Sequence, residues 1–367
     1  MRQLVKLAVS VLIVFNVGYA MAAETDSAAE SDPLKKLKLS GKISMEANYE
    51  KKNFADASAD DIESNGFAGT AELGIDVNIV KNVTGHVGLL WEENDEGSDS
   101  LNIDEAFLLL GENEIMPLFF KAGKMYTPFG KFETKMVSDP LTLEIGETRE
   151  TAAEIGFKYA GLYASAYAFN GEVNLADEDD KTDNFGANMG FAFESDGFGI
   201  DLGCGYINSI YDSNGLTDQM AAVREEAEAG GQSAALKEYV PGMAAYLVLK
   251  AGAFYVYGEY VAMLDDSETE YTDTASETIV NTVKSKAMKA WNVEAGCTFD
   301  IAGMEITFGA AYQGIKNADD VYPDNRYMGV ICLGIMKNTS FAVEYACDKY
   351  DNDDKGHTVT GKVEIEF

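Results

Sequence analysis

Residues 37–50 read LKLSGKISMEANYE, and their side chains alternate between apolar and polar along the whole stretch. The odd positions hold Leu, Leu, Gly, Ile, Met, Ala and Tyr, while every even position holds a charged or polar residue. Successive side chains of a β-strand point to opposite sides, so a period of two indicates a strand with one apolar face. We therefore expect this segment to separate an apolar environment from a polar one.

The same alternation recurs up to the end of the chain, in segments of about ten residues. The sequence predicts sixteen strands, over residues 38–51, 66–80, 83–93, 102–111, 118–126, 152–160, 162–170, 184–194, 198–208, 242–251, 253–263, 286–299, 303–313, 326–336, 339–348 and 357–367. Long connections follow the odd strands, and short ones such as Lys81-Asn82 follow the even strands. These features are typical of an all-β, transmembrane antiparallel β-barrel with short periplasmic turns and long extracellular loops. A secreted β-sandwich also alternates, but its connections would not fall into two length classes.

Aromatic residues occur at both ends of the predicted strands. At the loop ends they are Tyr49, Phe67, Trp91, Phe169, Phe185, Tyr206, Tyr260, Trp291, Tyr312, Tyr327 and Tyr345, and at the turn ends they are Phe193, Phe198, Phe254, Phe299, Phe341 and Phe367. Two aromatic girdles at the membrane interfaces would explain both groups, with outer-membrane lipid as the surrounding medium. The terminal Phe367 resembles the aromatic residue by which the barrel-assembly machinery recognises its clients.

The first 22 residues have the features of a secretory signal peptide. Arg2 and Lys6 precede a short apolar stretch, and Ala20-Met21-Ala22 supplies small residues for cleavage. About 11 apolar residues are too few for a transmembrane helix, which needs roughly 20. We expect residues 23–36 to form an acidic periplasmic segment without a plug domain, and residues 37–367 to form a barrel in the outer membrane.

Composition excludes several other classes of protein. The formal net charge is −34, so the surface should not bind nucleic acid. The four cysteines lie in separate strand-like segments, where we interpret them as small apolar residues rather than as disulfide partners. His86 and His357 are the two histidines, and they are expected far apart, so the pattern does not predict an enzyme. The acidic runs lack the ligand spacing of an EF-hand loop, and we expect no metal and no cofactor.

One segment is similar to a known family. Residues 123–134 read GKMYTPFGKFET, residues 137–144 read VSDPLTLE and residues 146–150 read GETRE. This stretch resembles the siderophore porins of the legiobactin-receptor (LbtU) type, most strongly over about residues 100–160. The part GKxxxPFG is less specific, since phosphate-selective porins carry a similar run, but the Arg/Lys ladder of a phosphate porin is absent. The resemblance implies an outer-membrane porin that takes up an iron–siderophore without an energised plug.

The connection over residues 127–151 is more apolar than the other long connections. In sixteen-stranded porins the third loop folds into the lumen and narrows it, and we expect the same here. The candidate constriction residues are Lys131, Glu133, Lys135, Asp139, Glu144, Glu147, Arg149 and Glu150. The alternative is an outer loop that packs against its neighbours or against a partner subunit. Porins of this size often form homotrimers.

The parity of the strands predicts which charges face the lumen. The candidate pore-lining residues are Lys42, Glu46, Glu72, Asp76, His86, Lys158, Asp201, Glu259, Glu294, Arg326, Glu344 and Lys362. Together with Glu154, Glu194, Glu305, Glu364 and Glu366 they give an acidic excess that attracts cations. The sequence therefore predicts passive diffusion of a small solute, by resemblance a ferric siderophore. The alternative function is that of a general cation-preferring diffusion porin.

Overall fold

The computed structural model describes residues 36–55, 62–93, 100–111, 117–173, 175–176, 183–276, 278–318 and 321–367. One compact unit, Leu39–Phe367, contains the sheet and the site discussed below. The expected signal peptide over 1–22 lies outside the described residues. So do the acidic segment over 23–36, apart from Lys36, and the acidic run over 177–180.

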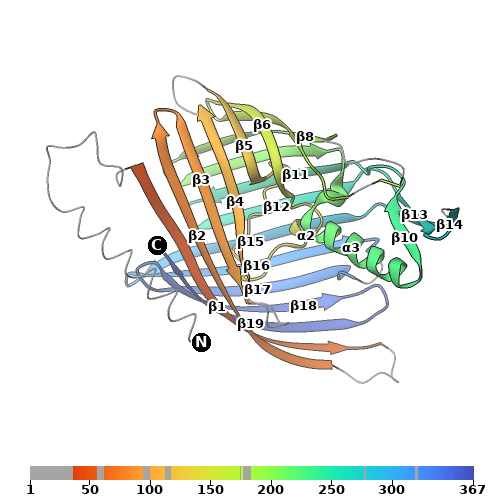
Figure 1. Cartoon of the computed structure of the whole chain (residues 1–367). Coiled ribbons are helices and arrows are strands. Elements are labelled where there is room, and N and C mark those ends of the chain that lie inside the picture. The colour runs from red at the N-terminus through yellow and green to blue at the C-terminus, as the bar shows by residue number, and fades with distance from the viewer. Residues whose placement is uncertain are drawn as a thin grey trace. The chain divides into compact units, whose positions relative to one another are not determined.

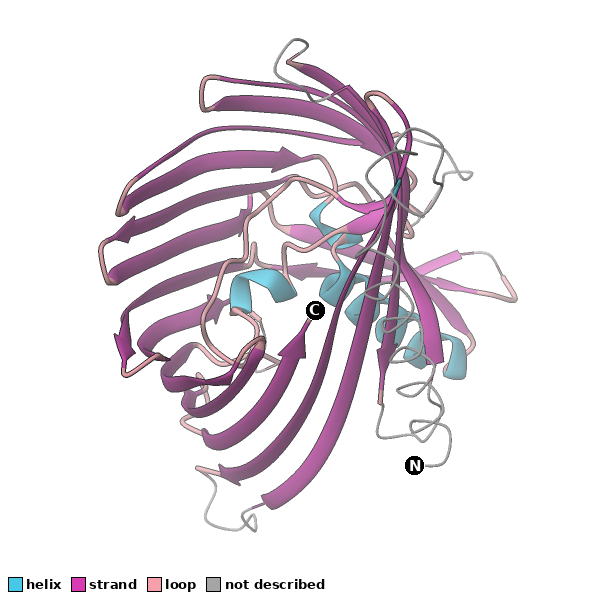
Figure 2. Cartoon of the chain, turned by 90° about the vertical axis from the view of Figure 1, so that its left-hand side faces the viewer, coloured by secondary structure: helices cyan, strands magenta, loops and turns pink. Residues whose placement is uncertain are grey.

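Sixteen of the described strands form one closed antiparallel barrel (Figures 1 and 2). They are β1 (Leu37–Asn53), β2 (Ile62–Val80), β3 (Val83–Glu92), β4 (Ser100–Gly111), β5 (Leu118–Tyr126), β6 (Arg149–Tyr159), β7 (Leu162–Phe169), β8 (Asn184–Ser195), β9 (Phe198–Ile207), β11 (Gly242–Ala251), β12 (Phe254–Met263), β15 (Lys289–Ile301), β16 (Met304–Lys316), β17 (Asn325–Met336), β18 (Thr339–Lys349) and β19 (Lys355–Glu366). Each corresponds to one predicted strand, with ends that differ by a few residues, so the predicted barrel is confirmed.

The barrel closes between its first and last strands. β1 pairs antiparallel with β19, in a register that runs from Lys42 opposite Glu366 to Asn53 opposite Lys355. Beyond that ladder, the backbone N–H of Phe367 donates to the carbonyl oxygen of Gly41, and the N–H of Gly41 donates to the carbonyl oxygen of Phe367, both at 2.9 Å. Closure matters because an open sheet edge would leave unpaired N–H and C=O groups in hydrocarbon.

The outward faces of the strands carry apolar side chains that the rest of the chain leaves uncovered. Phe67, Ile155 and Phe254 are 71%, 62% and 63% exposed. Phe169 is a correction to the predicted girdle, because it is only 1% exposed and packs beside Tyr167. The odd residues of β7 face inward, so its aromatic residues belong to the interior of the barrel rather than to its rim.

Tight turns join neighbouring strands at one end of the barrel. Ala160-Gly161 and Ala302-Gly303 have φ of 52° and 86°, and of 57° and 82°, respectively. Two consecutive residues with positive φ give a turn whose twist matches that of a hairpin. The paired residues thus explain how a two-residue connection can turn the chain between adjacent strands.

Several elements lie outside the sixteen-stranded sheet. They are α2 (Leu141–Glu144), η2 (Ile210–Asp212), α3 (Asn214–Ala229) and a three-stranded sheet of β10 (Gln232–Leu236), β13 (Ser267–Asp273) and β14 (Thr278–Ser285). α3 lies in the long connection between β9 and β11, just before β10. The small sheet was not predicted. Within the described ranges, no helix is both long and apolar enough to cross a bilayer.

Candidate functional site

The segment 127–148, which joins β5 to β6, lies inside the ring of strands together with α2 (Figure 2). We call it the inner loop. It bonds to side chains of β12, β15, β16 and β18 that alternate with outward, exposed residues such as Val293 and Val343. The sequence-based boundary at residue 151 was too long, since Arg149 and Glu150 already belong to β6.

Three inward glutamates bind the inner loop to the barrel wall. The first, Glu259 on β12, accepts hydrogen bonds from the backbone N–H of Lys131 at 2.7 Å and of Phe132 at 3.1 Å. It also accepts one from Thr142 Oγ1 at 2.9 Å. Glu259 is 7% exposed. A buried carboxylate is costly unless donors surround it, and here the loop supplies three.

The other two glutamates repeat this arrangement further along the loop. Glu294 on β15 accepts from Thr134 Oγ1 at 2.6 Å and from the N–H of Lys135 at 2.9 Å. Glu344 on β18 accepts from the N–H of Val137 at 2.6 Å and from Ser138 Oγ at 2.6 Å. These glutamates are 0% and 1% exposed. The three carboxylates are therefore the anchors of the inner loop.

This arrangement corrects one part of the sequence prediction. Glu259, Glu294 and Glu344 were expected to line the open lumen, where each would attract cations. Instead the inner loop covers all three, and its N–H and O–H groups donate to them. The pairing joins residues more than one hundred positions apart, so nothing local in the sequence could have indicated it.

Apolar packing fixes the same loop. Phe129, Leu141 and Ile145 are at most 2% exposed and belong to one cluster with Ile207 and Ile315 of the wall. Leu216 of α3 is in this cluster too, so the largest buried core forms inside the barrel between the inner loop, α3 and the strands. Burial of a large apolar side chain contributes about 1.5–3 kcal/mol, which suffices to keep the loop against the wall.

Two glycines allow the loop to approach the wall closely. A Cβ atom on Gly205 of β9 would lie 2.0 Å from the carbonyl oxygen of Phe129. A Cβ atom on Gly130 would lie 2.4 Å from the ring of Phe132 and 2.9 Å from Glu259 Oε1. Neither distance is sterically possible without movement of the backbone or the ring. These positions explain why the run PFGKF follows this path.

The charged candidates of the inner loop and the adjoining start of β6 make specific contacts. Lys131 Nζ lies 3.0 Å from Asp201 Oδ2, and Glu133 Oε1 lies 3.4 Å from Lys250 Nζ. Arg149 forms an ion pair with Asp104 of β4. The backbone N–H of Lys135 donates to the carboxylate of Glu294, as described above. Glu150 pairs with Met125 in the β5–β6 ladder.

Glu144 and Glu147 lie near α3 and partly out of water, whereas Asp139 is exposed. Glu147 Oε1 accepts from Asn214 Nδ2 at 3.1 Å, and Glu144 Oε2 accepts from Tyr322 Oη at 3.4 Å. Burial, reinforced by the charge of Asp139, raises the pKa of Glu147 to about 7. Desolvation by the surrounding chain also raises the pKa of Asp139 and that of Glu144 above their ordinary values. This end of the loop therefore holds carboxyl groups that resist ionisation.

Most of the other predicted pore-lining residues form pairs along the wall. These contacts join Lys42 to Glu72 at 2.6 Å, Glu46 to Lys362 at 3.1 Å, Asp76 to His86 at 2.7 Å and Arg326 to Asp348 at 2.7 Å. The inward acids are thus partly balanced by neighbouring bases. Over the described part of the chain, no group of three or more His, Cys, Asp or Glu side chains has the geometry to hold a metal ion.

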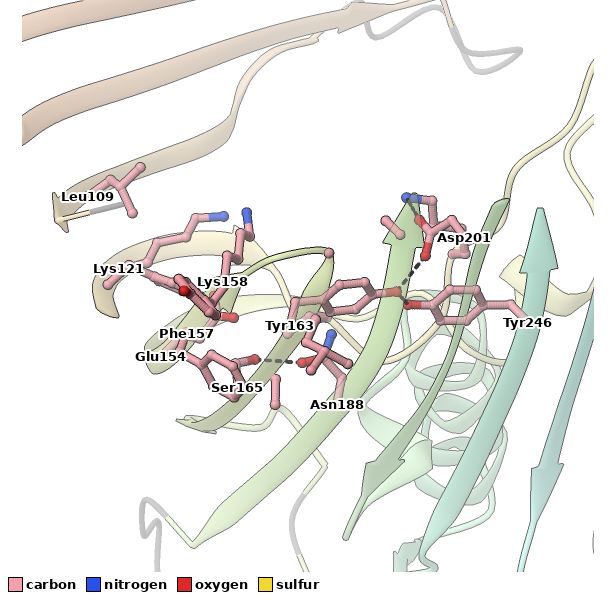
Figure 3. A pocket seen from close by; sticks show the side chains of 18 of the residues that line it. Leu109, Lys121, Glu154, Phe157, Lys158, Tyr163, Ser165, Asn188, Asp201 and Tyr246 are labelled. Atoms are coloured by element: carbon pink, nitrogen blue, oxygen red, sulfur yellow. Dashed lines mark hydrogen bonds and ion pairs between the residues drawn. The ribbon is translucent and has the colours of Figure 1, made fainter. Parts of the chain in front are cut away.

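A cavity of about 820 Å³, which we call the lateral cavity, lies between the start of the inner loop and strands of the opposite wall (Figure 3). Its lining includes Lys158 and Asp201, which the sequence indicated. It also includes Phe107, Phe119 and Lys121, which were missed. Their strands gave a weak signal: the run FLLLG over 107–111 does not alternate, and the β3–β4 register shifts at Gly88 and Leu89.

Known proteins similar to this chain fall into two groups. No protein-family model matches the sequence. A UPF0422 protein of Coxiella burnetii is 25% identical over 273 residues, which cover 72% of this chain and 55% of that protein. A UPF0422 protein of Legionella pneumophila is 26% identical over 292 residues, covering 76% and 53%. The chain thus spans about half the length of the curated relatives it matches.

Solved structures similar to this chain include outer-membrane proteins. The channel DcaP of Acinetobacter baumannii has a TM-score of 0.57 at 12% identity, covering 94% of this chain and 100% of that one. OprB of Pseudomonas putida has a TM-score of 0.57 at 10% identity, covering 93% of this chain and 96% of that one. OmpF of Salmonella typhi has a TM-score of 0.57 at 13% identity, covering 90% of this chain and 97% of that one. The chain therefore has the closed sixteen-stranded barrel fold of these outer-membrane channels.

Proposed function

We propose that this protein is an outer-membrane channel through which a small solute diffuses passively. The observation that carries the proposal is the inner loop, held along the inside of a closed sixteen-stranded barrel by three buried carboxylates. Sixteen strands enclose a lumen wider than side chains alone can fill. A loop fixed across part of that lumen would narrow the passage and select solutes by size and charge.

The outer surface supports a membrane location. Its exposed apolar side chains run along the strands, and exposed aromatic residues such as Tyr206, Tyr260 and Phe299 lie near the strand ends. In water, so much uncovered apolar surface would favour aggregation, whereas in a bilayer it contacts lipid tails. An outer-membrane location is consistent with this pattern and with the barrel-assembly role that the sequence suggests for Phe367.

We infer an iron–siderophore as the solute from the sequence resemblance. The stretch that resembles the siderophore porins, residues 123–150, contains the whole inner loop, so the likeness falls on the element that would control passage. The competing proposal is a general cation-preferring diffusion channel, and the acidic excess of the inward side chains favours it. A homotrimer is the assembly we propose for either function.

Two experiments test these proposals separately. Purified protein in planar bilayers should form a steadily open channel, and deletion of 139–146, which removes α2, should raise its conductance because the narrowed section widens. Unchanged conductance in the deletion variant would contradict the role of the inner loop. Uptake of labelled ferric siderophore by cells that lack the gene then tests the solute. Normal uptake without the protein would reject the siderophore and leave the general channel.

A further inference from the structure

The wall opposite the loop anchors carries apolar side chains where the alternation leads one to expect polar ones. Phe107 and Leu109 of β4 and Phe119 of β5 all line the lateral cavity. None of them lies on the lipid face, since the neighbouring Leu108, Leu110 and Phe120 are the exposed residues. Apolar side chains grouped around a cavity of about 820 Å³ are typical of a small-molecule site, which usually spans roughly 300–1,000 Å³.

Two lysines bring positive charge to the same lining. The ammonium group of Lys121 lies 3.9 Å from the centroid of the Phe107 ring, and that of Lys158 lies 5.5 Å from the centroid of the Phe119 ring. Figure 3 shows both side chains rising from the wall on the open side of the cavity. The ring faces attract each ammonium group and restrict where it can move.

Acidic and basic groups are nearly balanced around the cavity. Asp201 pairs with Lys131 at 3.0 Å and accepts from Tyr163 Oη at 2.6 Å. Glu105 Oε1 lies 3.9 Å from Lys121 Nζ, at the limit of an ion pair. Glu154 is the other acid of the lining and is 7% exposed. With Glu105 counted beside the lining, three lysines face three acids, so this wall is close to neutral in a chain with a net charge of −34.

We propose that the lateral cavity binds a small organic anion, with its carboxylate on Lys121 and Lys158 and its carbon skeleton against the apolar wall. Other polar groups of the lining, namely Ser165, Asn188 and the hydroxyls of Tyr163 and Tyr246, supply further hydrogen-bonding atoms. The inference rests on the proposed channel function, since a solute on its way through the barrel would reach this site. It names the chemical class of that solute.

Equilibrium dialysis of the detergent-solubilised protein at low salt tests the site without using conductance. The probes are phenylacetate, which has both a carboxylate and a ring, acetate, which lacks the ring, and benzyl alcohol, which lacks the charge. Phenylacetate should bind more tightly than either analogue. Replacement of both lysines (K121Q with K158Q) should weaken phenylacetate binding about tenfold or more, because a charge-assisted contact is lost.

Matched variants separate charge from folding. K121R with K158R keeps both charges and should bind phenylacetate more tightly than the double glutamine variant. K337Q removes a lysine from the exposed turn between β17 and β18 and should bind phenylacetate like the wild type. Equal binding of acetate and phenylacetate, or an unchanged affinity in the double glutamine variant, would overturn the proposal. A conducting channel without binding rejects the site alone, and binding without conductance rejects the channel alone.

Discussion

At the scale of single residues, the buried carboxylates show how charge can fix a loop. Glu294 is fully buried, yet Thr134 Oγ1 and the N–H of Lys135 donate to it, so the loop replaces its hydration. Removal of the carboxylate by Glu294→Ala leaves both donors unsatisfied, at a cost of about 1–3 kcal/mol each. The barrel ladder does not depend on this side chain. Glu294→Ala should therefore destabilise the attachment of the inner loop rather than the barrel.

We predict that Glu294→Ala raises the channel conductance and its current noise in planar bilayers, while heat-modifiable gel mobility stays that of a folded barrel. Glu305→Ala is the matched control, because Glu305 is an exposed residue of β16 near the turn to β15 and lies outside the contacts that anchor the loop. Wild-type conductance in Glu294→Ala, or the same change in both variants, would contradict the anchoring role.

The raised pKa of Glu147 predicts that the stability of the inner loop depends on pH. Its pKa is about 7 in the folded chain, against 4.5 for the ordinary side chain, and burial is the main cause. The folded state thus favours the protonated form. The stability that the protonated, buried carboxyl group gives to the loop is fully present below about pH 4.5, and it is lost as the pH rises through 7. Asp139, Asn214, Arg149 and Asp104 are the groups that act on this carboxyl.

We therefore expect single-channel noise from the inner loop to increase between about pH 5 and pH 8. Glu147→Gln carries a permanently neutral group that can still accept from Asn214, so its noise should stay low across this range. Bilayer recordings of both proteins at several pH values give the comparison. If the noise of Glu147→Gln rises with pH as it does in the wild type, other acids cause the pH dependence. Asp139 and Glu144 are then the first candidates.

At the scale of elements, the strands could be predicted and their partners inside the barrel could not. Alternation is a local pattern, so a strand such as β1 or β19 can be recognised from about ten residues of sequence. The anchors are not, because Glu344 meets Val137 across 207 positions. Phe169 was misassigned for a related reason: its place at a strand end fits a girdle, but the side it faces depends on Tyr167 and the wall. The sheet of β10, β13 and β14 was missed because its short strands lack the alternation over about ten residues that identified the barrel strands.

Gly205 tests whether β9 sets the position of the inner loop. A Cβ atom there would lie 2.0 Å from the carbonyl oxygen of Phe129, so Gly205→Ala must displace the loop. We expect a changed conductance with an intact barrel. Gly258→Ala on β12 is the control, since nothing lies within 4 Å of the added atom. A wild-type conductance in Gly205→Ala would show that the loop yields without consequence.

The register of β2 can be tested by placing a charge on each face. Leu73 pairs with Leu89, and Asp76 is bonded to His86 at 2.7 Å, which puts the two side chains on opposite faces. Arginine on the lipid face costs about 2–4 kcal/mol near the midplane, but little where it meets water. Leu73→Arg should therefore impair assembly, and Asp76→Arg should not. Heat-modifiable mobility compares them, and similar behaviour of both would refute the assigned facing.

At the scale of the whole molecule, the distribution of charge decides which ions pass. The chain carries 62 acidic and 28 basic residues, and many of the acids lie on inward positions of the barrel. Against this background, the lateral cavity is a local exception on one wall. Small mobile ions sample the field of the entire lumen, whereas a bound solute experiences only the groups it touches. The two kinds of charge can thus act on different solutes.

We predict that the open channel prefers cations, and that this preference weakens as salt increases. Screening shortens from about 10 Å at 0.1 M to about 3 Å at 1 M, so the field of the wall reaches the centre of the lumen only at low salt. Reversal potentials across bilayers with a salt gradient measure the preference directly. Anion preference at low salt would contradict this prediction.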